Sequence, residues 1–263
     1  MNFGPVNPEL FPGARNAVET CLNVQTGERV ALIADDPSRE VAASLAEVLA
    51  QRSAQWMGLL VEDVAARPVV EAPRELLQAL ENAEVGILCM QPMPGELPTR
   101  MAIVRVVERR RIRYAHMVGV TAEIMQQGMR TDYRRVDRLS DRLRERMKSA
   151  STLRVQTEAG TEFTASFDPA LDWVKTSGLI SPQYWSNLPA GEVFTTPARV
   201  DGRFVCDGTA GDYFNQKYGD LQRTPLVLEI EAGRLVRAEC ARKELEGEFW
   251  EYTHTDENSD RVG

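Results

Sequence analysis

Glu192 is the residue whose surroundings most suggest chemistry. It lies in the stretch Asn-Leu-Pro-Ala-Gly-Glu-Val-Phe-Thr-Thr-Pro, residues 187–197, where Gly191 permits an unusual φ and a proline stiffens each flank. A rigid backbone around one carboxylate suits a metal ligand or a catalytic base, because the position of such a group must be held closely. A solvated glutamate in a surface turn is the alternative.

His116 is the second candidate. It lies near the end of an apolar run, residues 112–120, and a histidine that faces a cleft there could act as a catalytic base. A histidine that only packs an interface at the end of a strand is the alternative. The other histidine, His254, lies in a polar segment and is expected to be exposed.

Composition narrows the classes of function. The 263 residues carry a net charge of −8, which disfavours nucleic acid and anionic membranes as partners. The four cysteines are far apart and none forms a Cys-x-x-Cys pair, so reduced thiols are expected. The sequence shows no secretory signal and no apolar run of membrane-spanning length, so a cytoplasmic protein is expected. No Gly-x-Gly-x-x-Gly, P-loop, His-Glu-x-x-His or Gly-x-Ser-x-Gly motif is present.

The first half of the chain predicts the elements that would position these residues. Four apolar runs alternate with segments of helical period, which indicates a doubly wound, mainly parallel sheet in a Rossmann-like α/β domain. The runs are residues 29–34, 56–61, 84–90 and 112–118. Such sheets bind ligands beyond the carboxyl ends of their strands. The polar side chains expected near those ends are Asp35, Asp36, Glu62, Asp63 and His116.

Residues 129–149 predict an amphipathic helix whose polar face mixes arginines with acidic residues. A nucleic-acid patch is one interpretation. A solvated face with ion pairs between successive turns is the interpretation adopted here.

The second half is rich in strands. Two alternating segments, residues 152–167 and 225–240, each contain an Ala-Gly pair and predict β-hairpins. We therefore expect an α/β domain over residues 1–150 and a smaller, β-rich α+β domain over residues 151–263. Glu192 is expected at the entrance of a strand in the second domain, facing the cleft between the two.

The segment Ser-Asn-Leu-Pro-Ala-Gly-Glu-Val-Phe-Thr-Thr-Pro-Ala-Arg-Val-Asp-Gly-Arg-Phe-Val-Cys-Asp-Gly, residues 186–208, resembles the signature of the aminopeptidase T family of dinuclear metallo-aminopeptidases. Residues 117–136 and 153–167 also resemble that family. The resemblance implies hydrolysis of N-terminal residues from peptides. It further implies a divalent metal (zinc, cobalt or manganese) and a metal-ligand role for Glu192.

The resemblance has a limit at the carboxyl end. In that family a second Gly-Glu pair and histidine ligands follow later in the chain, whereas this sequence ends at Gly263. The resemblance thus implies a chain that lacks the part carrying most metal ligands and binds metal poorly. Such a chain is either a truncated member or a non-catalytic fragment.

A related branch of the same superfamily offers a different enzyme class. That branch resembles non-haem iron(II) dioxygenases that cleave dihydroxypyridine-type rings, in which His116 would be the base. The partners expected are a small peptide or small-molecule substrate, with no nucleic acid and no membrane. A homodimer is the oligomer considered.

Overall fold

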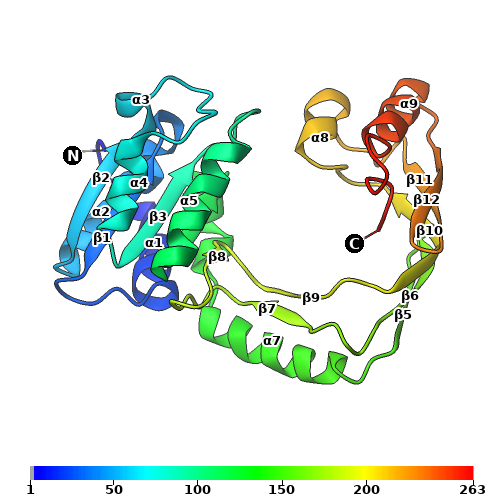
Figure 1. The fold of residues 1–263 in the computed structure, drawn as a ribbon, viewed down its shortest axis with the longest axis horizontal. Coiled ribbons are helices and arrows are strands. Elements are labelled where there is room, and N and C mark those ends of the chain that lie inside the picture. Colours follow the sequence, from blue (N-terminus) through cyan, green and yellow to red (C-terminus); the bar gives the residue numbers. More distant parts are fainter. Residues whose placement is uncertain (1–2, 263) are drawn as a thin grey trace. The chain divides into compact units, whose positions relative to one another are not determined.

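The computed structural model describes residues 3–262, and these form two compact units (Figure 1). Unit 1 comprises Met1–Leu143 and Lys175–Val193, and unit 2 comprises Arg144–Val174 and Phe194–Gly263. The sequence predicted a single passage between domains near residue 150. In the structure the chain returns to unit 1 once before it completes unit 2.

Unit 1 is built on a parallel sheet, as predicted. Its order is β2-β1-β3-β4-β8, with β1 (Arg29–Ala34), β2 (Gln55–Leu60), β3 (Val85–Met90), β4 (Arg113–Val118) and β8 (Ser186–Asn187). Every residue of β3 is buried, because the strand is central and both of its faces are covered. The doubly wound α/β class is therefore confirmed.

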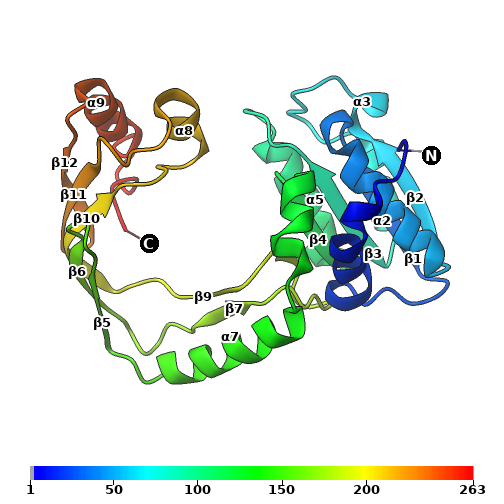
Figure 2. The same ribbon diagram turned by 180° about the vertical axis from the view of Figure 1, so that it is seen from behind.

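Helices cover both faces of this sheet (Figures 1 and 2). Alternate strand residues point to opposite faces, so each face contributes to a separate hydrophobic core. One face packs against the elements around α2 (Arg39–Gln51), and the other packs against α4 (Arg74–Glu81) and α5 (Leu97–Arg110). The remaining helical segments of the first 147 residues are η1 (Pro8–Leu10), α1 (Phe11–Arg15), η2 (Asn16–Cys21), η3 (Asp36–Ser38), α3 (Val61–Val64), α6 (Ala122–Gln126), η4 (Gly128–Arg130) and α7 (Tyr133–Met147).

Unit 2 is an antiparallel sheet with two helices. The sheet has the order β12-β11-β10-β6-β5, and both predicted hairpins are present in it. Its strands are β5 (Thr152–Gln156), β6 (Glu162–Ser166), β10 (Arg199–Cys206), β11 (Leu226–Glu231) and β12 (Arg234–Glu239), and its helices are α8 (Asp212–Tyr218) and α9 (Lys243–Tyr252). None of the helices in residues 3–262 is long and apolar enough to cross a lipid bilayer.

A short two-stranded ribbon accompanies α7. It consists of β7 (Val174–Thr176) and β9 (Glu192–Phe194). Lys175 Nζ of β7 lies 2.8 Å from carboxylate oxygens of both Asp137 and Asp141 of α7, which fastens the ribbon to the helix.

A buried ion cluster closes the carboxyl end of the parallel sheet. Arg67 is paired with Asp35, which directly follows β1, and with Glu96, which directly precedes α5. The Arg67 side chain is 8% exposed and both carboxylates are 0% exposed, so these charges are shielded from water and rely on each other. Burial alone would raise the pKa of Glu96, but the hydrogen bonds from Arg67 and the Val69 amide outweigh it and hold that pKa below its ordinary value.

The same cluster ties together the loops that follow three strands. Asp35 also accepts hydrogen bonds from the amides of Ser38 at 3.0 Å and Gln91 at 2.7 Å. Arg67 donates to the Gln91 carbonyl oxygen at 2.6 Å. Asp35 and Glu62 therefore lie at the carboxyl ends of their strands, as the sequence indicated, but both lie beside Arg67. At this end of the sheet the Arg67 guanidinium, and not a ligand, lies between the carboxylates of Asp35 and Glu62.

Replacing Arg67 by alanine should lower the free energy of unfolding by about 3–5 kcal/mol, because two buried carboxylates lose their counter-charge. The matched control is Arg74→Ala, since Arg74 is exposed and forms no ion pair with any described residue. That variant should change stability by no more than about 0.5 kcal/mol. Urea unfolding of both variants checks this, and equal stabilities would contradict a structural role for the cluster.

Candidate functional site

The candidate site gathers around His116 on the face of β4 that α5 covers. Tyr114 lies two residues earlier on the same face, and its hydroxyl is 3.1 Å from His116 Nδ1. Trp185, just before β8, completes a ring cluster, with its centroid 5.8 Å from that of His116 and 6.2 Å from that of Tyr114. His116 is thus surrounded by aromatic surfaces and keeps Nε2 free of any hydrogen bond to a described residue.

The surroundings keep the imidazole neutral. Burial, and in second place the positive charge of Arg100, lower the pKa of His116 to about 4. Burial also raises the pKa of Tyr114, so its phenol stays protonated. When Nδ1–H donates to the Tyr114 oxygen, Nε2 carries a lone pair and can accept a proton. The imidazole is therefore unprotonated at ordinary pH, where Nε2 is available as a hydrogen-bond acceptor and as a weak base.

Arg100 brings an unpaired positive charge to the same region. It lies in the first turn of α5, where its amide donates to the Glu96 carbonyl oxygen at 3.1 Å. Its Nε atom is buried and finds no hydrogen-bond partner within residues 3–262. The guanidinium also forms no ion pair with a described carboxylate. A buried donor of this kind favours an anionic ligand, because leaving it unsatisfied costs free energy.

Glu192 lies elsewhere, at the first residue of β9. Its carboxylate is exposed and accepts a hydrogen bond from Thr176 Oγ1 at 3.3 Å. Gly191 before it has a φ of 154°, in accordance with the unusual φ that the sequence suggested. Since Glu192 is not among the neighbours of His116, the structure does not bring the two predicted site residues together. Their catalytic and metal-binding roles remain predictions.

The described residues do not fit the expected divalent metal. Zinc and iron sites generally use three or more protein ligands. Within residues 3–262, no group of three or more His, Cys, Asp or Glu side chains is placed to hold an ion. Glu192 alone supplies one carboxylate, with only the Thr176 hydroxyl beside it.

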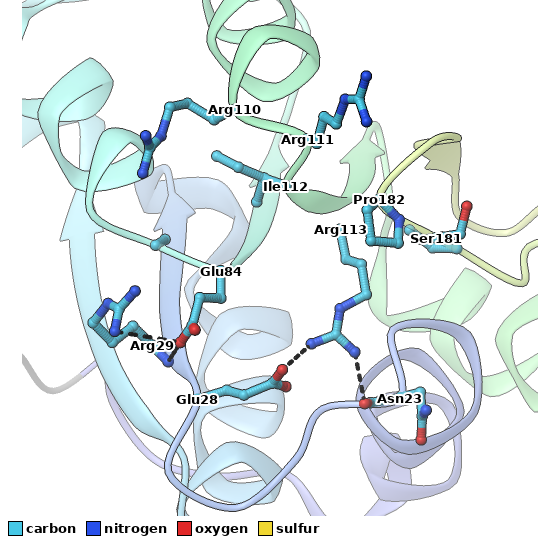
Figure 3. A pocket seen from close by; sticks show the side chains of 12 residues that line it. Asn23, Glu28, Arg29, Glu84, Arg110, Arg111, Ile112, Arg113, Ser181 and Pro182 are labelled. Carbon is cyan, nitrogen blue, oxygen red and sulfur yellow. Dashed lines mark hydrogen bonds and ion pairs between the residues drawn. The ribbon is translucent and has the colours of Figure 1, made fainter.

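A polar hollow of about 580 Å³ lies at the end of the parallel sheet where the strands begin, opposite the Arg67 cluster (Figure 3). Its charges are used internally: Arg113 pairs with Glu28 and donates to the Asn23 carbonyl oxygen at 2.9 Å, and Arg29 pairs with Glu84 at 3.6 Å. These ion pairs connect the N-terminal ends of β1, β3 and β4. We regard the hollow as a structural feature rather than a second site.

Sequence reasoning missed Tyr114, Arg100 and Trp185. Tyr114 could have been found, because a strand places residues two apart on the same face. Arg100 and Trp185 come from a helix and a distant loop, and no local pattern connects either to His116.

Three comparisons place this fold among known proteins. The family model described as NicX, 2,5-dihydroxypyridine 5,6-dioxygenase, matches residues 10–251. The 2,5-dihydroxypyridine dioxygenase from Pseudomonas putida KT2440 has a similar structure, with a TM-score of 0.69 and 18% identity over 98% of this chain and 75% of that one. AmpT from Thermus thermophilus is also similar, with a TM-score of 0.63 and 16% identity over 97% of this chain and 76% of that one. At these identities the two structures show the shared fold. No curated protein sequence matches.

The His116 environment predicts an unusual titration. With a pKa of about 4, the imidazole should stay neutral while the pH is lowered from 8 to 5 and take up its proton only below that. Replacing Arg100 by glutamine removes a positive charge and should therefore raise the His116 pKa. NMR of the ring carbons reads this directly, because the chain has only two histidines. His254 serves as the internal control, and a His116 pKa near 6.5 would contradict the site's described electrostatics.

Proposed function

The chain belongs to the NicX family, 2,5-dihydroxypyridine 5,6-dioxygenase, and we propose that it takes part in oxidative cleavage of a dihydroxylated nitrogen-containing aromatic ring. This reverses the order of the two activities that the sequence suggested, in which the aminopeptidase came first. The superfamily is shared with AmpT, but the family model that matches bears the name of the dioxygenase.

The observation that supports the proposal most is the neutral His116 beside an unpaired Arg100. A hydroxylated ring has an acidic O–H, and His116 Nε2 would accept its proton. The Arg100 guanidinium would then balance the charge on the ring oxygen. Trp185 offers an aromatic face for a flat ring.

The metal that the family name implies would bind and activate oxygen. The ligand set for such an ion is not found among residues 3–262. The roles proposed for these residues are therefore limited to binding and orienting the substrate and moving its proton. His116 moves a proton, Arg100 holds the anionic oxygen and Trp185 orients the ring.

Aminopeptidase activity is the second candidate. Glu192 follows Gly191 on a constrained backbone at the start of β9, and the fold is similar to that of AmpT. In that proposal Glu192 would be a metal ligand. The two candidates use different residues, and this makes them separable by mutation.

The dioxygenase proposal predicts that the chain binds 2,5-dihydroxypyridine. His116→Gln should weaken this binding by roughly tenfold or more, because the Nε2 acceptor for the ring hydroxyl is lost. His254→Gln is the matched control and should retain the affinity. A titration followed by the change in ring absorbance measures both, and an unchanged affinity of the His116→Gln variant would contradict the proposal.

The opposite result would favour the second candidate. Release of N-terminal leucine from a chromogenic amide with zinc, cobalt or manganese, abolished by Glu192→Ala and unaffected by His116→Gln, would support an aminopeptidase. The same preparation would then show no binding of 2,5-dihydroxypyridine that depends on His116.

A further inference from the structure

A smaller hollow of unit 1 lies beside Trp185, and we call it the Trp185 hollow. Its volume is about 250 Å³, and it lies between the end of α5 and the turn of residues 181–184 that precedes Trp185. Arg111, Ile112 and Pro182 also border the larger hollow of Figure 3. An apolar cavity of about 150 Å³ can hold benzene, so the Trp185 hollow has room for one six-membered ring with small substituents.

The end of α5 forms the apolar floor of the Trp185 hollow. The Ile112 amide donates to the Val107 carbonyl oxygen at 3.0 Å, and the Arg111 amide donates to the Glu108 carbonyl oxygen at 3.2 Å. These two hydrogen bonds form a Schellman motif, which ends a helix and brings the apolar residues on either side of its end together. Val107 and Ile112 are 1% and 3% exposed, so the floor is part of the packed core.

The walls of the Trp185 hollow are held by hydrogen bonds. Ser181 and Tyr184 exchange backbone hydrogen bonds of 3.1 and 3.2 Å, which fix the turn that carries Pro182. Trp185 Nε1 donates to Glu108 Oε1 at 3.3 Å, which holds the indole against α5. An aromatic wall suits a flat ring. Because both walls are fixed beforehand, a ligand loses little free energy in ordering them.

Arg111 brings to this hollow a positive charge without a counter-charge. The neighbouring Arg109 and Arg110 both pair with Glu81, whereas Arg111 forms no ion pair within residues 3–262. In Figure 3 its side chain points away from Glu28, the nearest acidic partner of another arginine there. A free guanidinium favours a carboxylate, which it can bind through two parallel hydrogen bonds.

The backbone at Arg111 gives a second reason to look for a ligand. Its φ is 54°, in the left-handed region, where glycine is the usual residue after a helix. A side chain at this φ costs free energy that glycine would not cost. Arg109 and Arg110 already supply the positive charge that stabilises the end of α5. The end of the helix therefore does not explain the arginine, whereas an anionic ligand does.

We propose that the Trp185 hollow binds a small aromatic carboxylate that also carries a hydrogen-bond donor. The ring lies against Trp185, its carboxylate pairs with Arg111 and its donor contacts the exposed Glu108 carboxylate. Because Glu108 is negative, the donor and the carboxylate must lie at opposite ends of the ring. 4-Aminobenzoate meets these requirements. It has no ring hydroxyl to give a proton to His116, so this proposal does not rest on the proposed function.

Calorimetric titration with 4-aminobenzoate tests the site. The wild-type chain should bind one molecule. Benzoate and aniline, which each lack one of the two polar groups, should bind about three- to tenfold more weakly. Arg111→Gly should weaken the binding of 4-aminobenzoate by roughly tenfold or more, because the counter-charge is lost. The variant should remain folded, because glycine favours the left-handed backbone at this position.

Three control variants should keep the wild-type affinity, and circular dichroism establishes that each variant is folded. Ser53→Gly is the matched control, since Ser53 has the same φ of 54° and does not line the Trp185 hollow. Arg110→Gln tests for a general loss of positive charge beside the hollow. Arg100→Gln tests for binding at the His116 site instead.

A wild-type chain that does not bind 4-aminobenzoate would overturn the proposal, as would an affinity that Arg111→Gly leaves unchanged. Equal affinities for 4-aminobenzoate and either of the other two ligands would also contradict it, because one of the two polar groups would then go unrecognised. Binding that is lost in Arg100→Gln but kept in Arg111→Gly would place the ligand at His116 and overturn the assignment to this hollow.

Discussion

The pairing of Arg67 with two buried carboxylates is the constraint on which unit 1 depends. Asp35 directly follows β1 and Glu96 directly precedes α5, so one guanidinium sets the position of a helix relative to the central strands. Arg100 lies one turn further along α5. The ion cluster therefore reaches the candidate site, because it anchors the turn that presents Arg100 to Tyr114 and His116.

The same pairing explains why the usual ligand position of a doubly wound sheet is not the site proposed here. In such sheets the ligand lies beyond the carboxyl ends of the strands, where the strand order reverses. Here that place, between β1 and β3, is crossed by Arg67 and its hydrogen bonds to the Gln91 backbone. Near His116, Arg100 of α5 carries a positive charge that forms no ion pair with a described carboxylate, and it lies toward the covered face of β4. The side chains of the Arg67 cluster are fully engaged with one another. We therefore place the proposed site at His116 and the aromatic rings beside it.

The sequence predicted the strands well and the site only in part. Four apolar runs matched β1 to β4 closely, since buried parallel strands need continuous apolar residues. His116 could be chosen because it is a rare titratable residue in such a run. Arg100 and Trp185 could not, because their proximity to His116 depends on tertiary packing. The pairing of Asp35 with Arg67 could not be predicted either, because Arg67 follows β2 and nothing in the local sequence relates it to β1.

The central claim is that His116, Arg100 and Trp185 receive a hydroxylated aromatic ring. A crystal structure of the chain with 2,5-dihydroxypyridine, prepared without oxygen, tests this most directly. We expect a ring against Trp185 with one oxygen within hydrogen-bond distance of His116 Nε2 and the Arg100 guanidinium close to it. A ring bound away from these three side chains, or beside Glu192, would contradict this placement.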